Sequence, residues 1–402
     1  MVPTLDWAMF AHRRRAAFAS RPEESRGRRY REPESPDRTA FQRDRDRIVH
    51  STAFRRLKHK TQVFVYHEGD HYRTRLTHSI EVAQIARSIA RTLGLDEDLT
   101  EALALAHDFG HTAFGHAGEE ALDKAMAPYG GFDHNAQTLR VVTKLEQRYA
   151  EFDGLNLTWE TLEGLVKHNG PLLDAADAER SGLPAAIGEY AEVEDLELHL
   201  WPGPEAQVAA LADDIAYNNH DIDDGLHAGL FDLDDAAEVP LIGEMVAAVR
   251  QRYHDLARDR LIHESIRRMI DRMVGDVIEE TGRRVEACAP RNVDDVRRLG
   301  EPLVAFSPAM VEANRGVKTF LHTQMYNHYK LNRSHSKARR IVTELFDFLL
   351  ADPDCLPTEW RARAEGPRNP ETARLVADYI AGMTDAFALN EARRLFEWDT
   401  GI

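Results

Sequence analysis

Apolar residues recur along most of the chain at spacings of three and four positions, the period that places them on one face of an α-helix. The clearest stripe runs from Val82 to Leu93, and Gly94 is suited to end that helix. Weak strand signals are confined to segments 61–66 and 193–200. The pattern therefore predicts an all-α, multi-helix fold. Further helices are expected at 134–149, 158–168, 204–224, 241–280, 308–351 and 370–397.

Two of the expected helices meet near a group of histidines. The first is predicted to begin near Thr77, and Asp96 is a good N-cap for the second. The second helix is expected to stop at a glycine, which places His107 and Asp108 at its C-terminal end. A loop over residues 111–115 then leads to a further short helix.

Composition divides the chain into three parts. Residues 1–36 are rich in Arg, Glu, Ser and Pro, and we expect a basic, flexible N-terminal arm. Residues 37–235 form the body, in which 170–203 reads as a loop-rich insertion. Residues 236–402 form a C-terminal helical region, and the boundary is expected near 230–240.

Charge is distributed unevenly, because the formal net charge is −17 while residues 11–60 hold 16 Lys and Arg against 7 Asp and Glu, a local charge of +9. An acidic body disfavours general nucleic-acid binding, but the basic arm leaves open a weak contact with single-stranded nucleic acid. No apolar run approaches the roughly 18 residues of a membrane span, so we expect a cytoplasmic protein with no membrane partner. The two cysteines, Cys288 and Cys355, exclude a disulfide framework and a thiolate metal site.

The doublet of His107 and Asp108 brings an imidazole and a carboxylate to one helix end, where both can bind one ion. His78, near the start of the preceding helix, can face the same point. Acidic residues on an otherwise apolar helix are costly unless paired or metal-bound, which favours Asp213 as a fourth ligand. Such donors suit Mg, Mn, Fe, Co, Ni or Zn, so the sequence predicts a divalent metal site.

Each part of this pattern also has a plainer explanation. A single His-Asp pair often caps a helix end, and Asp213 with Asp214 can form the solvated face of an amphipathic helix. The metal interpretation is favoured by the combination of four ligands on three apolar helices. Asp213, Tyr217 and Asp221 also recur four residues apart, so they share one stripe of their helix.

The order of His78, His107-Asp108 and Asp213 resembles the HD superfamily of metal-dependent phosphohydrolases. A longer ordered set of segments is similar to bacterial dGTP triphosphohydrolase-like enzymes, from about residue 34 to 225 and again from 317 to 329. The segments are FQRDRDRI at 41–48, AFRRL at 53–57, KTQV at 60–63, RLTHS at 75–79, HDFGH at 107–111, FGHAGE at 114–119, HNAQ at 134–137 and ADDIAY at 212–217. The HD motif alone is weak, whereas this set is strong. It implies an all-α HD fold, with 37–235 as the metal-dependent catalytic core and 236–402 completing a nucleotide pocket.

The resemblance implies hydrolysis of deoxynucleoside triphosphates, dGTP or others, to a deoxynucleoside and inorganic triphosphate. A divalent ion on the four ligands would polarise an α-phosphate oxygen and lower the pKa of a bound water. His116 and Glu119 lie three residues apart at the start of a helix, so they can touch and serve as the general acid/base pair. His111 and His134 would assist this pair by contacting phosphates. The glycines around His116 are expected to keep the loop open.

The same resemblance implies how the nucleotide is held. Tyr217 would stack beneath the deoxyribose and leave no room for a 2′-hydroxyl. Gln62 and Asp221 would contact the 3′-hydroxyl. Arg75 and Lys318 would neutralise the triphosphate. Late contacts with the sugar and base would come from Tyr326 and Asn327.

The resemblance further implies a homo-oligomer, with the hexamer as a frequent form, and activation by a nucleotide at a second site. Two other functions stay open. An HD nucleotidase or phosphodiesterase would not explain the combination of Arg75, Lys318 and several histidines. A nucleotide-sensing or single-strand-binding regulatory protein on a degenerate HD core is disfavoured, because the four ligands and the pair of His116 and Glu119 are intact.

Overall fold

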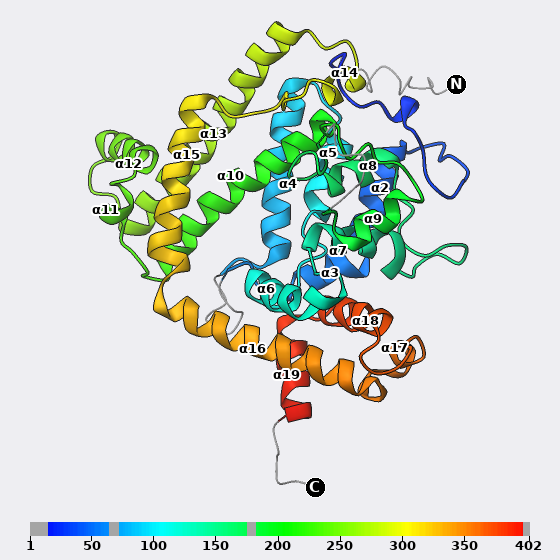
Figure 1. Cartoon of the computed structure of the whole chain (residues 1–402). Helices are drawn as coiled ribbons and strands as arrows, with labels where there is room; N and C mark the ends of the chain where they lie inside the picture. The colour runs from blue at the N-terminus through cyan, green and yellow to red at the C-terminus, as the bar shows by residue number, and fades with distance from the viewer. Residues whose placement is uncertain (1–14, 64–71, 175–181, 397–402) are drawn as a thin grey trace, which may run out of the picture.

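The computed structural model describes residues 15–63, 72–174 and 182–396, and their regular structure is helical (Figure 1). No strand occurs in these ranges, where β-pairing is limited to isolated bridges, so the predicted all-α fold is confirmed. The helices are the 3₁₀ helix Pro22–Glu24, α2 (Ala40–Val49), α3 (Thr52–Leu57), α4 (Arg75–Leu93), α5 (Glu97–Ala106), α6 (Gly115–Met126), the 3₁₀ helix Ala127–Tyr129, α7 (His134–Arg140), the π-helix Val141–Leu145, α8 (Trp159–Val166), α9 (Ala185–Ala191), α10 (Pro204–His227), α11 (Leu233–Ala236), α12 (Pro240–Arg252), α13 (Arg258–Cys288), α14 (Val293–Arg297), α15 (Pro308–Leu321), the π-helix His322–Tyr326, α16 (Tyr329–Ala351), the 3₁₀ helix Pro353–Cys355, α17 (Thr358–Arg361), α18 (Pro370–Ala381) and α19 (Asp385–Phe396).

Helices α4, α5 and α10 pack against one another at the centre of the molecule (Figure 1). The apolar stripe predicted for α4 is buried, including Val82 and Ile89. Helix α4 begins at Arg75, two residues before the predicted start, and Thr74 caps it by accepting the Thr77 amide. Gly94 ends it at φ 72°, a conformation that favours glycine. Sequence and structure agree here because both the stripe and the caps are local signals.

The neighbouring ends were also predictable from local residues. Asp96 caps α5 by accepting the Leu99 amide, which confirms the predicted N-cap. Helix α5 ends at Ala106, so His107 and Asp108 follow its last turn. Pro204 occupies the first turn of α10, where a proline costs no hydrogen bond, and this helix continues slightly beyond the predicted end.

Two long helices predicted from apolar periodicity are wrong, because each is broken in two. Segment 241–280 divides into α12 and α13 at residues 253–257, where Asp255 adopts φ 59°. The break allows α12 and α13 to pack against each other. Segment 308–351 divides at a π-helix followed by Asn327 and His328, and the His328 ring accepts the Lys330 amide at the start of α16.

The prediction of one helix over 370–397 is also wrong. The chain breaks at 382–384, between α18 and α19. The Asp385 carboxylate accepts the Thr61 amide at 2.9 Å and the Phe114 amide at 2.8 Å. These partners lie far away in sequence, and apolar periodicity carries no signal for them.

Neither weak strand signal forms a strand in the described residues. Thr61 makes an isolated bridge with Thr74, and residues 64–66 lie outside the described ranges. In segment 193–200, turns follow α9, and the Leu198 carbonyl accepts the Leu172 amide at 2.9 Å. The helix expected at 134–149 is shorter, because α7 passes into a π-helix that ends at Leu145.

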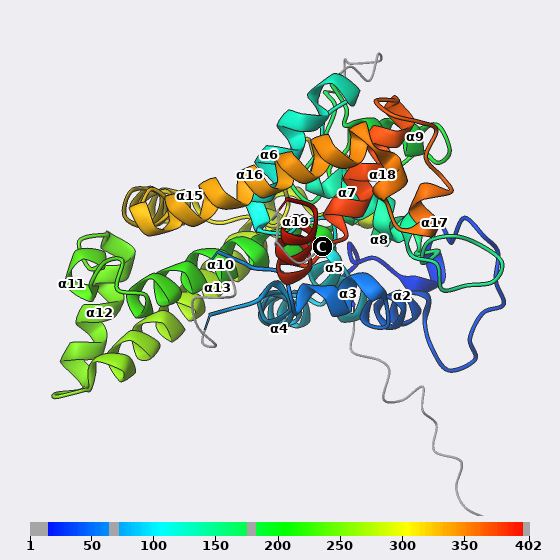
Figure 2. The same cartoon turned by 90° about the horizontal axis from the view of Figure 1, so that it is seen from below.

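A second group of helices covers one end of the central layer. Helix α16 packs on α6, α18 and α19, and together they enclose a core that includes Leu122, Val342 and Phe346 (Figures 1 and 2). Helix α6, which carries His116, is therefore held by C-terminal helices. The domain boundary near 230–240 stays a prediction. Within the described ranges, every helix is too short or too polar to cross a membrane.

Residues 15–36, within the predicted arm, make polar contacts with the body. The Ser20 amide and hydroxyl donate to the buried Glu205 carboxylate at 2.9 and 2.7 Å. Arg47 donates to both oxygens of Glu32 at 2.9 and 2.7 Å. This part of the chain is anchored, which differs from the flexible arm expected from its composition. Residues 1–14 lie outside the described ranges.

Candidate active site

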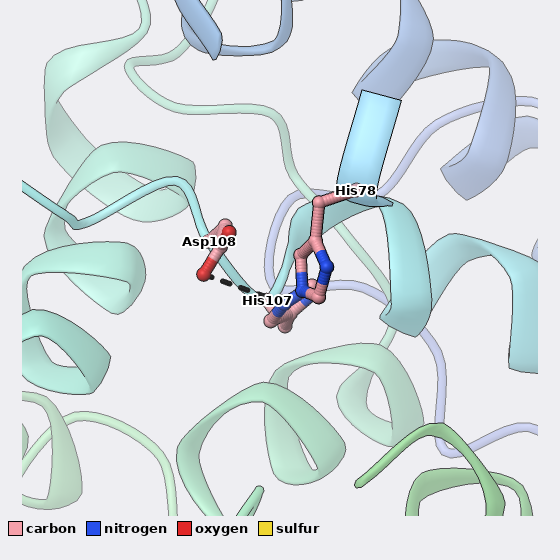
Figure 3. Close-up of side chains that lie close together, drawn as sticks. All are labelled: His78, His107 and Asp108. Atoms are coloured by element: carbon pink, nitrogen blue, oxygen red, sulfur yellow. Dashed lines mark ion pairs between the residues drawn. The ribbon is translucent and has the colours of Figure 1, made fainter. Parts of the chain in front are cut away.

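The four predicted metal ligands come together from three helices. His78 lies in the first turn of α4, and His107 and Asp108 follow α5 (Figure 3). Asp213 lies on α10. His78 Nε2 is 2.8 Å from Asp213 Oδ1. His107 Nε2 is 3.3 Å from Asp108 Oδ1 and 3.5 Å from Asp213 Oδ1. Donor atoms of His78, His107 and Asp108 lie within 4.8 Å of one another, so one ion can reach all three.

The state of His107 fits a bound cation. Its Nδ1–H donates to the Ala104 carbonyl at 2.7 Å, which directs Nε2 at the carboxylates. This buried Nε2 atom has no hydrogen-bond partner. Burial opposes a charged imidazole, but Asp108 and Asp213 outweigh it and raise the pKa of His107 to about 9. The site therefore attracts positive charge, and two imidazoles with two carboxylates are a donor set suited to a divalent transition metal.

A cavity of about 700 Å³ lies beside these ligands and is large enough for a nucleotide-sized molecule. Most of the predicted site residues line it. They are Gln62, Arg75, His78, His107, Asp108, His111, His116, His134, Asp213, Tyr217 and Lys318.

Glu119 lies beside three imidazoles that line the cavity, those of His111, His116 and His134. His116 Nδ1 is 3.4 Å from Glu119 Oε2, so the predicted pair is close, and the His116 side chain is 63% exposed. The shorter contact of Glu119 is with His134, whose Nδ1 donates to Oε1 at 2.7 Å. The His111 ring stacks on His134 with centroids 4.2 Å apart. Burial would raise the pKa of Glu119, but these histidines outweigh burial and hold that pKa below its usual range.

The glycines beside His116 serve different needs. Gly115 has φ 57°, a conformation that favours glycine, in agreement with the open backbone that was predicted. At Gly118 the prediction of openness is wrong, because a Cβ there would lie 2.0 Å from the Ala113 carbonyl oxygen. Gly118 is needed for close contact between α6 and the loop before it.

Two predicted substrate contacts are buried at the cavity wall. Arg75 Nη1 lies 2.9 Å from Asp108 Oδ2, so this guanidinium already pairs with a predicted metal ligand. The amide oxygen of Gln62 is buried and has no hydrogen-bond partner. A hydroxyl of a bound molecule would satisfy that acceptor.

Tyr217 and Asp221 on α10 contact Tyr326 of the C-terminal region. The Tyr217 and Tyr326 rings lie with centroids 6.4 Å apart, and the Tyr326 hydroxyl donates to the buried Asp221 carboxylate. Burial raises the pKa of Asp221 to about 8. Tyr217 lines the cavity, whereas Asp221 and Tyr326 do not. The Tyr326 ring lies next to the Tyr217 ring, and its hydroxyl is held by Asp221.

The last two predicted contacts differ in their placement. Lys318 lines the cavity and its Nζ lies 2.5 Å from Asp214 Oδ1. Asn327 is exposed, and its amide nitrogen is 3.3 Å from the His322 ring. Asn327 is thus not brought to the cavity lining, because it follows the π-helix that turns the chain before α16.

Two histidines of the site were missed in the sequence. His168 Nε2 is 3.4 Å from Asp213 Oδ2, and its ring stacks on His107 with centroids 5.4 Å apart. His220 Nδ1 is 3.3 Å from His78 Nδ1. The sequence signal for His168 was its position just after a helix end. The signal for His220 was its spacing of seven residues from Asp213, which places His220 and Asp213 on one face of α10.

Two protein-family models match parts of the chain that contribute residues to this site. The HD domain family model matches residues 75–218, and the phosphohydrolase-associated domain model matches residues 304–394. A deoxyguanosinetriphosphate triphosphohydrolase-like protein of Parvibaculum lavamentivorans is 63% identical over 382 residues, which cover 95% of this chain and 96% of that protein. The chain belongs to the deoxyguanosinetriphosphate triphosphohydrolase-like family. Deoxyguanosinetriphosphate triphosphohydrolase-like protein 1 of Mesorhizobium japonicum is 59% identical, over 96% of each chain. A deoxyguanosinetriphosphate triphosphohydrolase-like protein of Caulobacter sp. is 58% identical, over 96% of this chain and 97% of its own length.

Membership in this triphosphohydrolase-like family confirms the resemblance and supports a phosphohydrolase of the HD type. The HD match spans the four predicted metal ligands. The phosphohydrolase-associated match contains Lys318, Tyr326 and Asn327. The cluster of His78, His107 and Asp108 is able to hold a metal.

Proposed function

We propose that this chain hydrolyses deoxynucleoside triphosphates to a deoxynucleoside and inorganic triphosphate with a divalent metal ion. The observation that carries the proposal is one cavity of about 700 Å³ that joins three groups of residues. The groups are the four-ligand cluster, the imidazoles around Glu119, and the wall that contains Gln62 and Tyr217.

The metal would be held by His78, His107, Asp108 and Asp213. When bound, the ion polarises a phosphoryl oxygen and stabilises the charge that develops on it. Arg75 keeps Asp108 ionised and oriented through its ion pair at 2.9 Å. Mn or Mg is our proposed choice, and other transition metals suit the same donors.

Proton transfer is assigned to His116 and Glu119. The exposed His116 ring can reach a substrate oxygen, and its Nδ1 lies 3.4 Å from Glu119 Oε2. His134 donates to the other oxygen of Glu119 and so fixes its orientation. His111 and His134 would contact the phosphates, and Lys318 would neutralise their outer end.

Preference for a deoxyribose is assigned to Tyr217. A phenol packed beneath the sugar leaves no volume for a 2′-hydroxyl, so exclusion of ribonucleotides is steric. The buried, unpartnered oxygen of Gln62 would accept from the 3′-hydroxyl. Asp221 and Tyr326 hold the Tyr217 ring in place from behind.

Product analysis tests this proposal. Purified protein is incubated with each of the four dNTPs, singly and mixed, with Mn²⁺ or Mg²⁺ and with an EDTA control, and the products are separated by ion exchange. Metal-dependent release of deoxynucleoside and intact triphosphate is expected. Turnover of monophosphates or cyclic nucleotides alone would replace the proposal with an HD nucleotidase or phosphodiesterase. No turnover, even with mixed dNTPs, would favour a regulatory protein.

A homo-oligomer such as a hexamer, a second nucleotide site and a weak contact with single-stranded nucleic acid remain proposals. Gel filtration with light scattering tests the first. Activation of one dNTP's hydrolysis by another tests the second. Filter binding over a range of salt concentrations tests the third, because phosphate contacts weaken as salt rises.

A further inference from the structure

A second convergence of metal donors lies next to the four-ligand cluster. His111 comes from the loop after α5, while His116 and Glu119 come from the first turns of α6. One donor atom from each of these residues lies within 4.8 Å of the others. None of the three belongs to the four-ligand cluster.

The separations fit ligand spacings better than hydrogen bonds. His116 Nδ1 and His111 Nδ1 lie 3.4 and 3.7 Å from the same oxygen, Glu119 Oε2. A charge-assisted hydrogen bond is shorter, about 2.7–2.9 Å. Zinc–ligand bonds of about 2.0–2.1 Å place tetrahedral ligands roughly 3.3 Å apart. The 2.7 Å contact from His134 to the other oxygen of Glu119 is, by contrast, an ordinary hydrogen bond.

An independent observation points to a missing partner at the same place. His111 is buried, with 4% of its surface exposed, and its Nδ1 atom has no hydrogen-bond partner. Its other nitrogen already faces Asp108 Oδ1 at 3.2 Å. The unpartnered Nδ1 atom is directed at Glu119, where a cation would lie between them.

We propose that His111, His116 and Glu119 form a second, inhibitory binding site for a transition-metal ion such as Zn²⁺. Two imidazoles and one carboxylate are a donor set that zinc prefers, with a fourth position left open. His134 orients the carboxylate by donating to its other oxygen, as partners of metal ligands commonly do.

The inhibitory effect rests on the proposed function, whereas the existence of the site does not. An ion on His116 and Glu119 occupies the atoms that the proposed proton transfer uses. The same chain would therefore need one metal for activity and lose activity when a second ion binds.

Zinc stoichiometry tests the site directly. Metal-free protein is brought to equilibrium with micromolar Zn²⁺ by dialysis, and bound zinc is measured by mass spectrometry. Wild type is expected to bind two ions per chain. His116→Ala and His107→Ala are each expected to lose one, and the exposed His254→Ala is the matched control that keeps two.

The possible results separate clearly. A single tight ion in wild type, or two ions in His116→Ala, would overturn the site. Complete loss of zinc in His107→Ala would overturn its independence from the four-ligand cluster. His116→Ala is expected to fold, because that side chain is 63% exposed, and circular dichroism is used to check the folding of the other variants.

A kinetic titration tests inhibition. Zn²⁺ is added to manganese-loaded wild type during dNTP hydrolysis, and manganese content is measured in parallel to show that the first ion has not exchanged. Half-inhibition is expected at the Zn²⁺ concentration that half-fills the second site. Filling without inhibition would overturn the inhibitory role. If no triphosphate is released before zinc is added, the proposed function fails while the zinc count still decides the site.

Discussion

The Glu163 carboxylate lies between two buried cations, and its loss is expected to destabilise the protein. Arg297 Nε and Nη2 donate to its two oxygens at 2.9 and 2.8 Å, and Lys167 Nζ donates to one of them at 3.0 Å. All three side chains are buried, and together they join the end of α8 to α14. Glu163→Gln keeps the shape and removes the charge.

The magnitude follows from the distances. At an effective dielectric constant of about 20, unit charges about 2.9 Å apart attract by roughly 6 kcal/mol, and desolvation offsets part of this. Removing one partner of a buried pair costs about 3–5 kcal/mol. With an unfolding entropy of about 2.1 cal/mol/K per residue, 402 residues give about 0.8 kcal/mol/K, so the Tm should fall by about 4–6 °C. Burial also lowers the pKa of Lys167, although Glu163 opposes this shift. If Lys167 loses its proton in the variant, the fall in Tm should be about 4 °C.

Thermal unfolding followed by circular dichroism measures this effect. The matched control is Glu264→Gln, which removes the charge from an ion pair at the surface and should change the Tm by less than about 1 °C. The double variant Glu163→Gln with Lys167→Met should recover part of the loss, because it removes one uncompensated cation. A Tm change below about 1 °C for Glu163→Gln alone would refute the reasoning.

Four further outcomes are expected. His107→Ala should lose the catalytic metal and dNTP hydrolysis together, measured by metal analysis and triphosphate release. Glu119→Ala should retain that metal and lower kcat by roughly 10²–10⁴-fold, the usual effect of losing a general acid/base group. Tyr217→Ala should raise kcat/KM for ribonucleotides relative to deoxynucleotides. Burial raises the pKa of Asp221 to about 8, above an unfolded value of about 3.9, so its contribution to stability is full in acid and is lost as the pH rises through 8. Asp221→Asn should therefore reduce the fall in the free energy of unfolding between about pH 5 and pH 9, measured with urea.

Each of these outcomes has a clear contradiction. Full activity in His107→Ala would remove that residue from the metal site. Unchanged kcat in Glu119→Ala would end its catalytic assignment, and unchanged sugar discrimination in Tyr217→Ala would end the steric explanation. An identical pH dependence in wild type and Asp221→Asn would show that the pKa of this carboxyl is not raised in the folded protein.

The sequence predicted those parts of the fold that depend on neighbours along the chain. The stripe on α4, its end at Gly94 and the cap at Asp96 are local, and each was found. The break at Asp255 and the break before Asp385 were not, because apolar periodicity continues on both sides of each break. The Asp385 carboxylate accepts hydrogen bonds from amides more than 250 residues earlier in the chain, and neighbouring residues in the sequence carry no signal for these contacts.

Candidate site residues were predictable for a similar reason. His107 and Asp108 were conspicuous as a doublet at a helix end, and Asp213 as a carboxylate on an apolar helix. His168 was missed because a single histidine after a helix has many explanations, and only the fold brings it to Asp213. Asn327 was assigned from the resemblance alone, and in the structure it is exposed and follows the π-helix before α16.

Hydrolysis in H₂¹⁸O, analysed by mass spectrometry of both products, tests the central claim most directly. Attack of water on the α-phosphorus, with cleavage of the bond to the 5′ oxygen, places one ¹⁸O in triphosphate and none in the deoxynucleoside. We predict this pattern for metal-loaded wild type and its absence in Asp213→Ala. Label in the deoxynucleoside, release of pyrophosphate or monophosphate in place of triphosphate, or an active Asp213→Ala variant would contradict the account.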